Sequence, residues 1–495
     1  MFSCNIVTIV FFQFLLQYVL TKNVLVLVVD DGGFEIGAYG NNVIKTPNID
    51  LLAARGLLFN KAFTSVSSCS PSRASILTGL PTHQNGMYGL HHGIHNFNSL
   101  RNIKSLPIIL SNEGIRTGII GKKHVGPEEV FPFDFSQTEE NNSILQVGRN
   151  ITKIKFLVRN FFEKTKNNSF LLYVGLHDPH RCGHSNPKYG NFCEQFGNGK
   201  PGMGLIPDWI PIIYKPEDVI VPYHIQDTSI AREDIASQYT VISRADTGIG
   251  LILNELSAAG LENETLIIFT SDNGIPFPAG RTNVYDSGIA VPLIISSPDQ
   301  IVSKNKTTSN LASLLDITPT ILDWFNIHSN EHAFHSKFTG KSLLPLLNGE
   351  INSEQKAVFF SHNLHEVTMY YPMRAVRTKK YKLIHNLNYR MPFPIDQDFY
   401  ISPTFQELLN NTRFKKPTHW YRKLQDYYYR PDWELYDVLA DPEEKYNIIH
   451  HSSYNVTLKK LKMILEKWQV KTNDPWVCGT THVLENSTCL PLYNL

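Results

Sequence analysis

The sequence predicts an α/β fold with a mostly parallel central sheet, followed by a smaller α+β domain with an antiparallel sheet. Apolar runs of strand length alternate with helical segments, which is the pattern of a parallel sheet covered by helices on both faces. The chain of 495 residues is too long for one compact core, and its pattern changes after about residue 370. We therefore expect a main domain over residues 21–370 and a second domain over residues 371–495.

The chain begins with an apolar segment, MFSCNIVTIVFFQFLLQYVL. Polar residues interrupt its apolar part, so it fits the hydrophobic region of a signal peptide better than a membrane span. No later stretch of the sequence is long and apolar enough to cross a bilayer. We therefore expect residues 1–20 to be a signal peptide and the mature chain to enter the secretory pathway.

Strands in the main domain are expected at residues 23–29, 116–121, 170–175 and 266–270, and a fifth begins at Pro292. Helices are expected at residues 47–55, 106–113, 231–259 and 311–324. Polar residues follow each of the first four strands. Because the carboxyl ends of parallel strands lie along one edge of a sheet, these polar clusters should converge there.

In the second domain we expect an alternating strand at residues 377–386, another at 433–437, and an amphipathic helix at 458–468. Four cysteines lie outside the signal segment and the motif described below, at Cys182, Cys193, Cys478 and Cys489. Three pairings are open to them. Pairing of the first two and of the last two is the simplest, and each bond would stabilise its short loop by roughly 2–3 kcal/mol. Zinc binding is the alternative, without a C-x-x-C spacing to support it.

The polar residues after the first and fourth strands suit a hard metal ion. Asp30 and Asp31 follow the first strand, and Asp272 and Asn273 follow the fourth. Three carboxylates and one amide oxygen favour Ca²⁺ or Mg²⁺ over a metal that prefers thiolate. A polar turn would explain either pair taken alone.

Residues 65–79 read SVSSCSPSRASILTG and predict a helix that begins near Ser72. Cys69 would lie just before the helix N-terminus, where free N–H groups and the helix dipole favour an anion. Arg73 adds a positive charge nearby. For a lone cysteine, an inert buried side chain is the alternative.

The pattern C-x-P-S-R-A-S-x-L-T-G resembles the signature of the sulfatase family. In that family the cysteine is oxidised to formylglycine, whose hydrated aldehyde is the nucleophile, and a formylglycine-generating enzyme reads the residues at the positions of Pro71 and Arg73. The resemblance implies an alkaline-phosphatase-like fold with residues 21–370 as the catalytic domain. It also implies a Ca²⁺ ion bound by Asp30, Asp31, Cys69 in its modified form, Asp272 and Asn273.

The resemblance also implies a catalytic set made of Cys69, Arg73, Lys122, His124, His180 and Arg281. In this set Lys122 and Arg281 would stabilise charge on the sulfuryl oxygens. His180 would protonate the leaving group, and His124 would take a proton from the aldehyde hydrate so that sulfate leaves. A structural role is the alternative for each loop histidine.

Stretches such as HDPHRCGH, HEVTMYYPMRAV and MPFPIDQDFY resemble the lysosomal branch of the family that hydrolyses the N-sulfate of glucosamine at non-reducing ends of heparan sulfate. That branch also implies a homodimer. The sequence departs from it at Asp286-Ser287, where a Trp-Pro pair is expected. The resemblance therefore does not predict which residues form one wall of the pocket.

The net charge of +1 gives no reason to expect a nucleic-acid partner. Protonation of the 19 histidines in an acidic compartment would suit a polyanionic substrate. A glycosaminoglycan O-sulfatase or a phosphoesterase on the same scaffold remains an alternative. So does a non-enzymatic heparan-binding protein with an unmodified thiol at Cys69.

Overall fold

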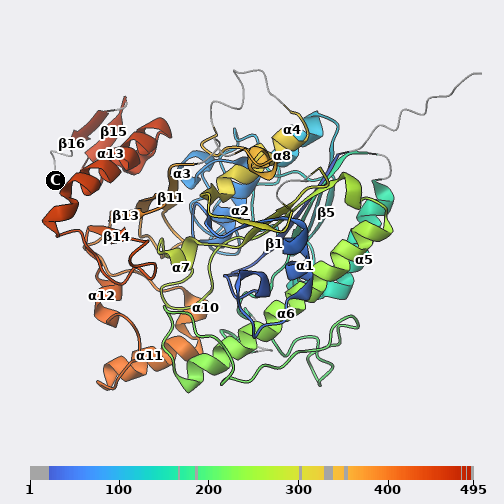
Figure 1. The fold of residues 1–495 in the computed structure, drawn as a ribbon, viewed down its shortest axis with the longest axis horizontal. Helices are drawn as coiled ribbons and strands as arrows, with labels where there is room; N and C mark the ends of the chain where they lie inside the picture. The colour runs from blue at the N-terminus through green and yellow to red at the C-terminus, as the bar shows by residue number, and fades with distance from the viewer. Residues whose placement is uncertain are drawn as a thin grey trace, which may run out of the picture.

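The structure is a computed structural model that describes residues 22–165, 168–183, 188–299, 304–327, 338–350, 355–480, 482–486 and 488–491. The expected signal peptide lies outside the described residues. Figure 1 shows a layered main domain, with the last strands and helices gathered at one end of it. None of the described helices is long and apolar enough to span a membrane.

The main sheet has eight strands in the order β5-β4-β6-β1-β7-β8-β2-β9. They are β1 (Asn23–Val29), β2 (Leu57–Phe59), β4 (Arg116–Gly121), β5 (Phe135–Thr138), β6 (Phe170–Gly175), β7 (Thr265–Ser271), β8 (Leu293–Ser296) and β9 (Lys306–Thr308). Neighbouring strands are parallel except where β8 pairs with β7 and β2. Strand β1 lies between β6 and β7, so the carboxyl ends of these strands meet at one edge.

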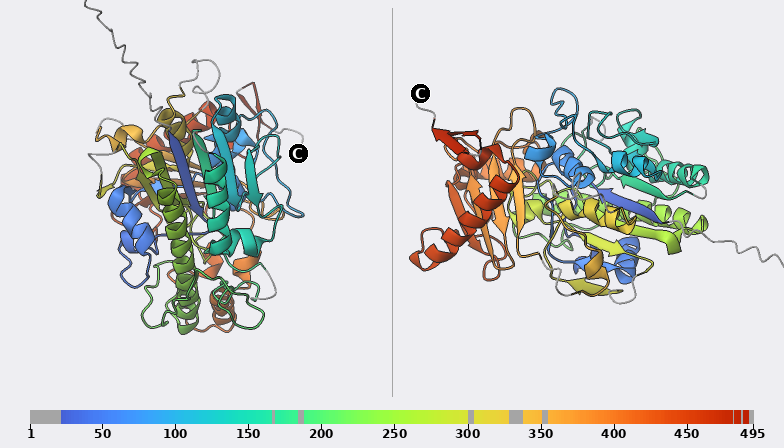
Figure 2. Two further views of the ribbon diagram at one scale, coloured as in Figure 1. Left: turned by 90° about the vertical axis from the view of Figure 1, so that its right-hand side faces the viewer. Right: turned by 90° about the horizontal axis from the view of Figure 1, so that it is seen from above.

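Helices cover both faces of this sheet, as Figure 2 shows. One face packs against α1 (Pro47–Arg55), α5 (Ile151–Lys164) and α6 (Ser229–Ala258), and the other against α2 (Cys69–Thr78), α4 (Leu106–Asn112) and α8 (Ile317–Trp324). Alternate residues of β1 enter the two cores, with Val26 in one and Leu25 in the other. The strand is apolar throughout because both of its faces are buried. The expected α/β fold is therefore confirmed.

Two expected elements differ from the structure in the main domain. The expected helix at 311–324 is β10 (Ala312–Ser313), a 3-10 turn and then α8. Ser313 and Asp316 form a reciprocal capping box, which begins a new helical segment there. The helix of the cysteine motif begins at Cys69 rather than Ser72, because the N–H of Ser72 already bonds the carbonyl of Ser68.

The second sheet is antiparallel, in the order β11-β12-β13-β14. Its strands are β11 (Val358–His362), β12 (Met373–Arg377), β13 (Tyr381–Asn386) and β14 (Trp433–Asp437). The expected strand at 377–386 is thus the end of β12, a turn and β13. The expected domain boundary at residue 371 falls between β11 and β12, which pair along their whole length.

The remaining α-helices and strands of the described residues complete the set. They are β3 (Ala62–Phe63), α3 (Thr82–Asn85), α7 (Asp286–Ile289), α9 (Leu344–Leu347), α10 (Gln397–Tyr400), α11 (Pro403–Arg413), α12 (Leu424–Tyr428), α13 (Asn455–Lys471), β15 (His482–Glu485) and β16 (Thr488–Pro491). Cys182 is bonded to Cys193 and Cys478 to Cys489, which confirms the local pairing. Phe63 and Tyr285 share a buried apolar cluster with Met373 of the second sheet, so one core joins the two parts.

Candidate active site

Cys69 is the first residue of α2, and all residues of this helix are buried. One turn later, Arg73 binds two carboxylates, with Nη2 3.2 Å from Asp30 Oδ1 and Nε 2.9 Å from Asp272 Oδ2. Its Nη1 donates to the carbonyl of Lys122 at 2.9 Å. Arg73 therefore fixes the start of α2 against the carboxyl ends of β1, β4 and β7.

Three fully buried carboxylates, Asp30, Asp31 and Asp272, lie together beside Cys69. The backbone N–H of Asp31 donates to Asp272 Oδ1 at 3.1 Å, and Asn273 Nδ2 donates to Asp31 Oδ1 at 2.7 Å. Ligand atoms of Asp30, Cys69 and Asp272 all lie within 4.8 Å of one another. Asn273 Oδ1 is buried without a hydrogen-bond partner among the described residues. Such a set of oxygens, one of them unsatisfied, fits a hard divalent cation.

Burial and the mutual repulsion of these carboxylates raise the pKa of two of them. Burial raises the pKa of Asp272 to about 7. Burial also raises the pKa of Asp31 well above its usual value, although Arg281 opposes the rise. For Asp30, burial is outweighed by Lys122 and its other cationic neighbours, so its pKa falls. A bound cation would relieve the repulsion among these carboxylates.

Two buried cations face this cluster. Lys122 Nζ pairs with Asp30, whereas the adjacent Lys123 turns away to Glu128. Arg281 pairs with Asp31 and also with two carboxylates of the second domain region, Asp396 at 2.6 Å and Asp398. Burial raises the pKa of Asp398, and Arg281 is the main opposing influence.

The expected histidines lie at the same edge of the sheet. His180 Nε2 is 3.7 Å from Asp31 Oδ2 and 3.5 Å from Asp398 Oδ2. His124 has a left-handed backbone, with φ of 55°, and its Nε2 lies 2.6 Å from His92 Nδ1. Burial lowers the pKa of both His180 and His124, which favours the neutral form of each ring.

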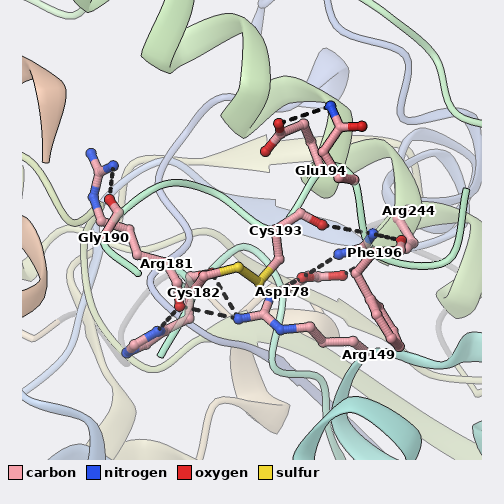
Figure 3. The surroundings of a disulfide bond; sticks show 11 residues. Arg149, Asp178, Arg181, Cys182, Gly190, Cys193, Glu194, Phe196 and Arg244 are labelled. Atoms are coloured by element: carbon pink, nitrogen blue, oxygen red, sulfur yellow. Dashed lines mark hydrogen bonds and ion pairs between the residues drawn. A yellow bond between two sulfur atoms is a disulfide. The ribbon is translucent and has the colours of Figure 1, made fainter. Parts of the chain in front are cut away.

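The loop that carries His180 is held by a network around the Cys182–Cys193 disulfide (Figure 3). Arg149 and Arg244 both bind Asp178, the latter with Nε 2.6 Å from Oδ2. Arg149 Nη2 also donates to the carbonyl of His180 at 3.0 Å. The cross-link and these ion pairs fix the backbone on both sides of His180.

A cavity of about 450 Å³ opens above Cys69. Predicted residues line its floor and sides, namely Cys69, Lys122, His124, His180 and Arg281. Asp30, Asp31, Arg73, Asp272 and Asn273 lie beneath or beside this floor, so the structure brings all the predicted site residues together. Sequence reasoning missed the remaining polar walls, formed by His92, His95, Glu139, Glu140, Tyr189, His365, Glu366, Asp396, Gln397 and Asp398. Acidic residues in MPFPIDQDFY were the available signal for the last of these.

Asp286-Ser287, the point of departure from the family branch, does not line this cavity. Both residues border a different cavity of about 290 Å³. Asp286 pairs with Arg377 Nη2 and with Lys382 Nζ, each at 2.9 Å. Asp286 therefore joins α7 to the second sheet, and neither residue contributes to the lining of the cavity over Cys69.

Asp286→Ala should destabilise the protein by about 3 kcal/mol, because it leaves buried Arg377 without its carboxylate partner. Urea unfolding would measure the change in free energy. Glu129→Gln removes a carboxylate from an exposed pair with Arg101 and should cost less than about 1 kcal/mol. Equal effects of the two substitutions would contradict the structural role of Asp286.

Comparison with known proteins agrees with this geometry. Residues 22–327 match the family model described as Sulfatase, and residues 280–395 match one described as N-sulphoglucosamine sulphohydrolase, C-terminal. The human protein N-sulphoglucosamine sulphohydrolase is 58% identical over 480 residues, covering 96% of this chain and 95% of the human one. An ulvan-active sulfatase of Formosa agariphila is 25% identical over 470 residues, covering 91% of this chain and 75% of its own.

Solved structures share the fold. A protein in complex with its substrate D-glucosamine-2-N,6-O-disulfate has a TM-score of 0.64 at 21% identity, covering 92% of this chain and 98% of that one. The phosphonate monoester hydrolase of Agrobacterium radiobacter has a TM-score of 0.62 at 18% identity, covering 95% and 99%. At these identities the likeness concerns the fold alone.

Proposed function

The chain belongs to the sulfatase family of hydrolases, and on that premise we propose that it hydrolyses the N-sulfate of glucosamine at non-reducing ends of heparan sulfate. The observation that carries the proposal is the cavity over Cys69, which combines buried cations with a histidine beside a carboxylate pair. Its volume of about 450 Å³ suits one sulfated sugar unit. The identity of 58% to the human N-sulphoglucosamine sulphohydrolase supports the same substrate.

The proposed nucleophile is formylglycine made from Cys69, whose hydrated aldehyde supplies a hydroxyl group for attack on sulfur. The unmodified side chain is poorly suited to this task. Burial raises the pKa of the Cys69 thiol; Lys122 opposes this rise, and the neighbouring carboxylates add to it. Because the thiolate is the reactive form of cysteine, a raised pKa makes the thiol a weaker nucleophile.

We assign the metal site to Asp30, Asp31, residue 69, Asp272 and Asn273, and the metal to Ca²⁺. A divalent cation there would polarise an oxygen of the sulfuryl group. Lys122 and Arg281 bind the other oxygens and stabilise the charge that develops on them. Both are buried and held by carboxylates, so they are oriented before the substrate arrives. Arg73 keeps α2 and two of the metal ligands in place.

The leaving group is an amine, which departs readily only when its nitrogen is protonated. His180 is the proposed donor, because its Nε2 faces the cavity between Asp31 and Asp398. The two carboxylates favour the protonated ring once a proton is taken up. His124, bonded to His92, is the proposed base that removes a proton from the hydrated residue 69 so that sulfate is released.

Sulfate release from the non-reducing N-sulfated glucosamine of a heparan oligosaccharide tests this proposal. O-sulfated sugars and phosphate esters are the matched alternatives, since a structural neighbour of this fold is a phosphonate monoester hydrolase. Preferred cleavage of either alternative would contradict the proposal. Intact mass tests the modification, because replacement of the CH₂SH group of Cys69 by CHO lowers the mass by a known amount. An unmodified thiol would favour a non-enzymatic heparan-binding protein.

Asp272→Asn should weaken Ca²⁺ binding at least tenfold, because it removes one of three ligand charges. Thermal unfolding provides a readout independent of activity, since a cation that binds only the folded state raises its midpoint. Calcium should raise the midpoint of the wild type and have a much smaller effect on the variant. An equal rise in both proteins would contradict the metal assignment.

The same proposal places the enzyme in the lysosome, which it reaches by the secretory pathway after removal of residues 1–20. The two disulfides are typical of proteins that fold in an oxidising compartment. Modification of Cys69 by the formylglycine-generating enzyme and assembly into a homodimer complete the proposal.

A further inference from the structure

We propose that Asp398 makes this enzyme selective for a sulfate bound through nitrogen over a sulfate bound through oxygen. The inference rests on the proposed function, because it concerns the bond that would be cleaved. The bridging atom of that bond is the nitrogen or oxygen that links sulfur to the sugar. It assigns a specificity role to a residue of α10, outside the cysteine motif and outside the metal site.

The carboxylate of Asp398 occupies a defined place in the cavity wall. One oxygen contacts Arg281, and the other lies 3.5 Å from His180 Nε2. Its side chain is 11% exposed and that of His180 is 17% exposed, whereas Cys69 is only 1% exposed. Asp398 and His180 therefore lie nearer the opening of the cavity than Cys69 does.

This position corresponds to the bridging atom of a bound substrate. In an in-line displacement the leaving atom lies on the side of sulfur opposite the nucleophile. With the nucleophile at residue 69 on the floor, the leaving atom points to the opening. The sulfuryl oxygens would contact the deeper Lys122 and Arg281, which places the bridging atom beside His180 and Asp398.

The two kinds of substrate differ at this atom. A sulfamate nitrogen carries a hydrogen and can donate it, whereas the bridging oxygen of a sulfate ester has only lone pairs. In its ionised form, paired with Arg281, the carboxylate of Asp398 is an acceptor only. Asp398 can thus accept from the sulfamate N–H, and it repels the oxygen of an ester. A site built to bind an N–H rejects the analogue that lacks it.

Asp398→Asn tests the assignment with two sugars that differ only in the bridging atom, N-sulfoglucosamine and glucose 2-sulfate. The expected loss in kcat/KM for N-sulfoglucosamine is about 10- to 100-fold, the range for a hydrogen bond to a charged group. Glucose 2-sulfate, measured both as a substrate and as a competitive inhibitor, should bind the variant as well as or better than the wild type. The reason is that the amide can donate to the ester oxygen.

Asp396→Asn is the matched control. Asp396 lies two residues earlier and pairs with the same Nη2 of Arg281, but its other neighbour is His365 rather than His180. This substitution should change kcat/KM for N-sulfoglucosamine and the affinity for glucose 2-sulfate by a similar factor and in the same direction. If Asp398→Asn also weakens the two sugars by the same factor, Asp398 only supports Arg281 and the assignment is wrong.

Equilibrium binding provides a second measurement that needs no variant of Asp398. In the inactive Cys69→Ser protein, N-sulfoglucosamine should bind at least about tenfold more tightly than glucose 2-sulfate. Equal affinities would overturn the assignment. A wild type that fails to cleave N-sulfoglucosamine at all would instead contradict the proposed function, so the two failures are distinguishable.

Discussion

Cys69→Ser is expected to lose more than about 10³-fold of the turnover of N-sulfoglucosamine, the scale of effect seen when an enzyme loses its nucleophile. Serine lacks the thiol that would be oxidised to the aldehyde, so the hydrated nucleophile cannot form. The substitution exchanges one small buried side chain for another at the start of α2. Sulfate release should therefore be lost, whereas the midpoint of thermal unfolding should stay close to that of the wild type.

Ser75→Ala, a buried position later in the same helix, is the control for this experiment. It should keep activity within a few-fold of the wild type, because Ser75 is absent from the lining of the cavity over Cys69. Appreciable turnover by Cys69→Ser would remove the nucleophile assignment. It would direct attention to another group at the floor of the cavity.

His180→Ala should reduce activity on N-sulfoglucosamine by about 10² to 10⁴-fold, the usual contribution of general acid catalysis. An activated aryl sulfate releases an acidic phenol, which departs without a proton. The same substitution should therefore affect the aryl sulfate far less. The comparison of the two substrates isolates proton donation from sulfate binding.

His177→Ala is the matched control, since His177 belongs to the same loop and its ring lies 5.0 Å from that of His180. Its Nδ1 is 2.8 Å from Glu139 Oε1, which indicates a supporting role. We expect similar losses on both substrates. If His180→Ala also shows equal losses, His180 binds sulfate or supports the fold, and His124 becomes the next candidate for the donor.

The sequence predicted the centre of the sheet better than its margin. Strands β1, β6 and β7 are buried on both faces, and an uninterrupted apolar run marks them clearly. Four strands are too short to show a pattern: β3 and β10 have two residues each, and β2 and β9 have three. The expected strand at 377–386 includes the last residue of β12 and the turn before β13, because the alternation of residues continues through that turn.

The same division applies to the site. Its floor follows from the chain itself, since residues directly after β1, β4, β6 and β7 must meet at one edge. Its acidic wall does not. Asp396 and Asp398 do not follow a strand of the main sheet, and only the packing of α10 against Arg281 brings them to the cavity. Contacts between residues over a hundred positions apart leave no local signal.

The burial of α2 sets an order of events during biosynthesis. An enzyme that modifies Cys69 must reach its side chain, and in the folded protein residues 69–73 are all buried. The oxidation that we propose must therefore precede folding. Arg73 has Asp272 as a partner, and about 200 residues separate them. At about 5–20 residues per second, synthesis of that stretch takes about 10–40 s. During that interval Arg73 lacks one of the two carboxylates that hold it in the folded protein. The interval is therefore a minimum time available for modification of the motif.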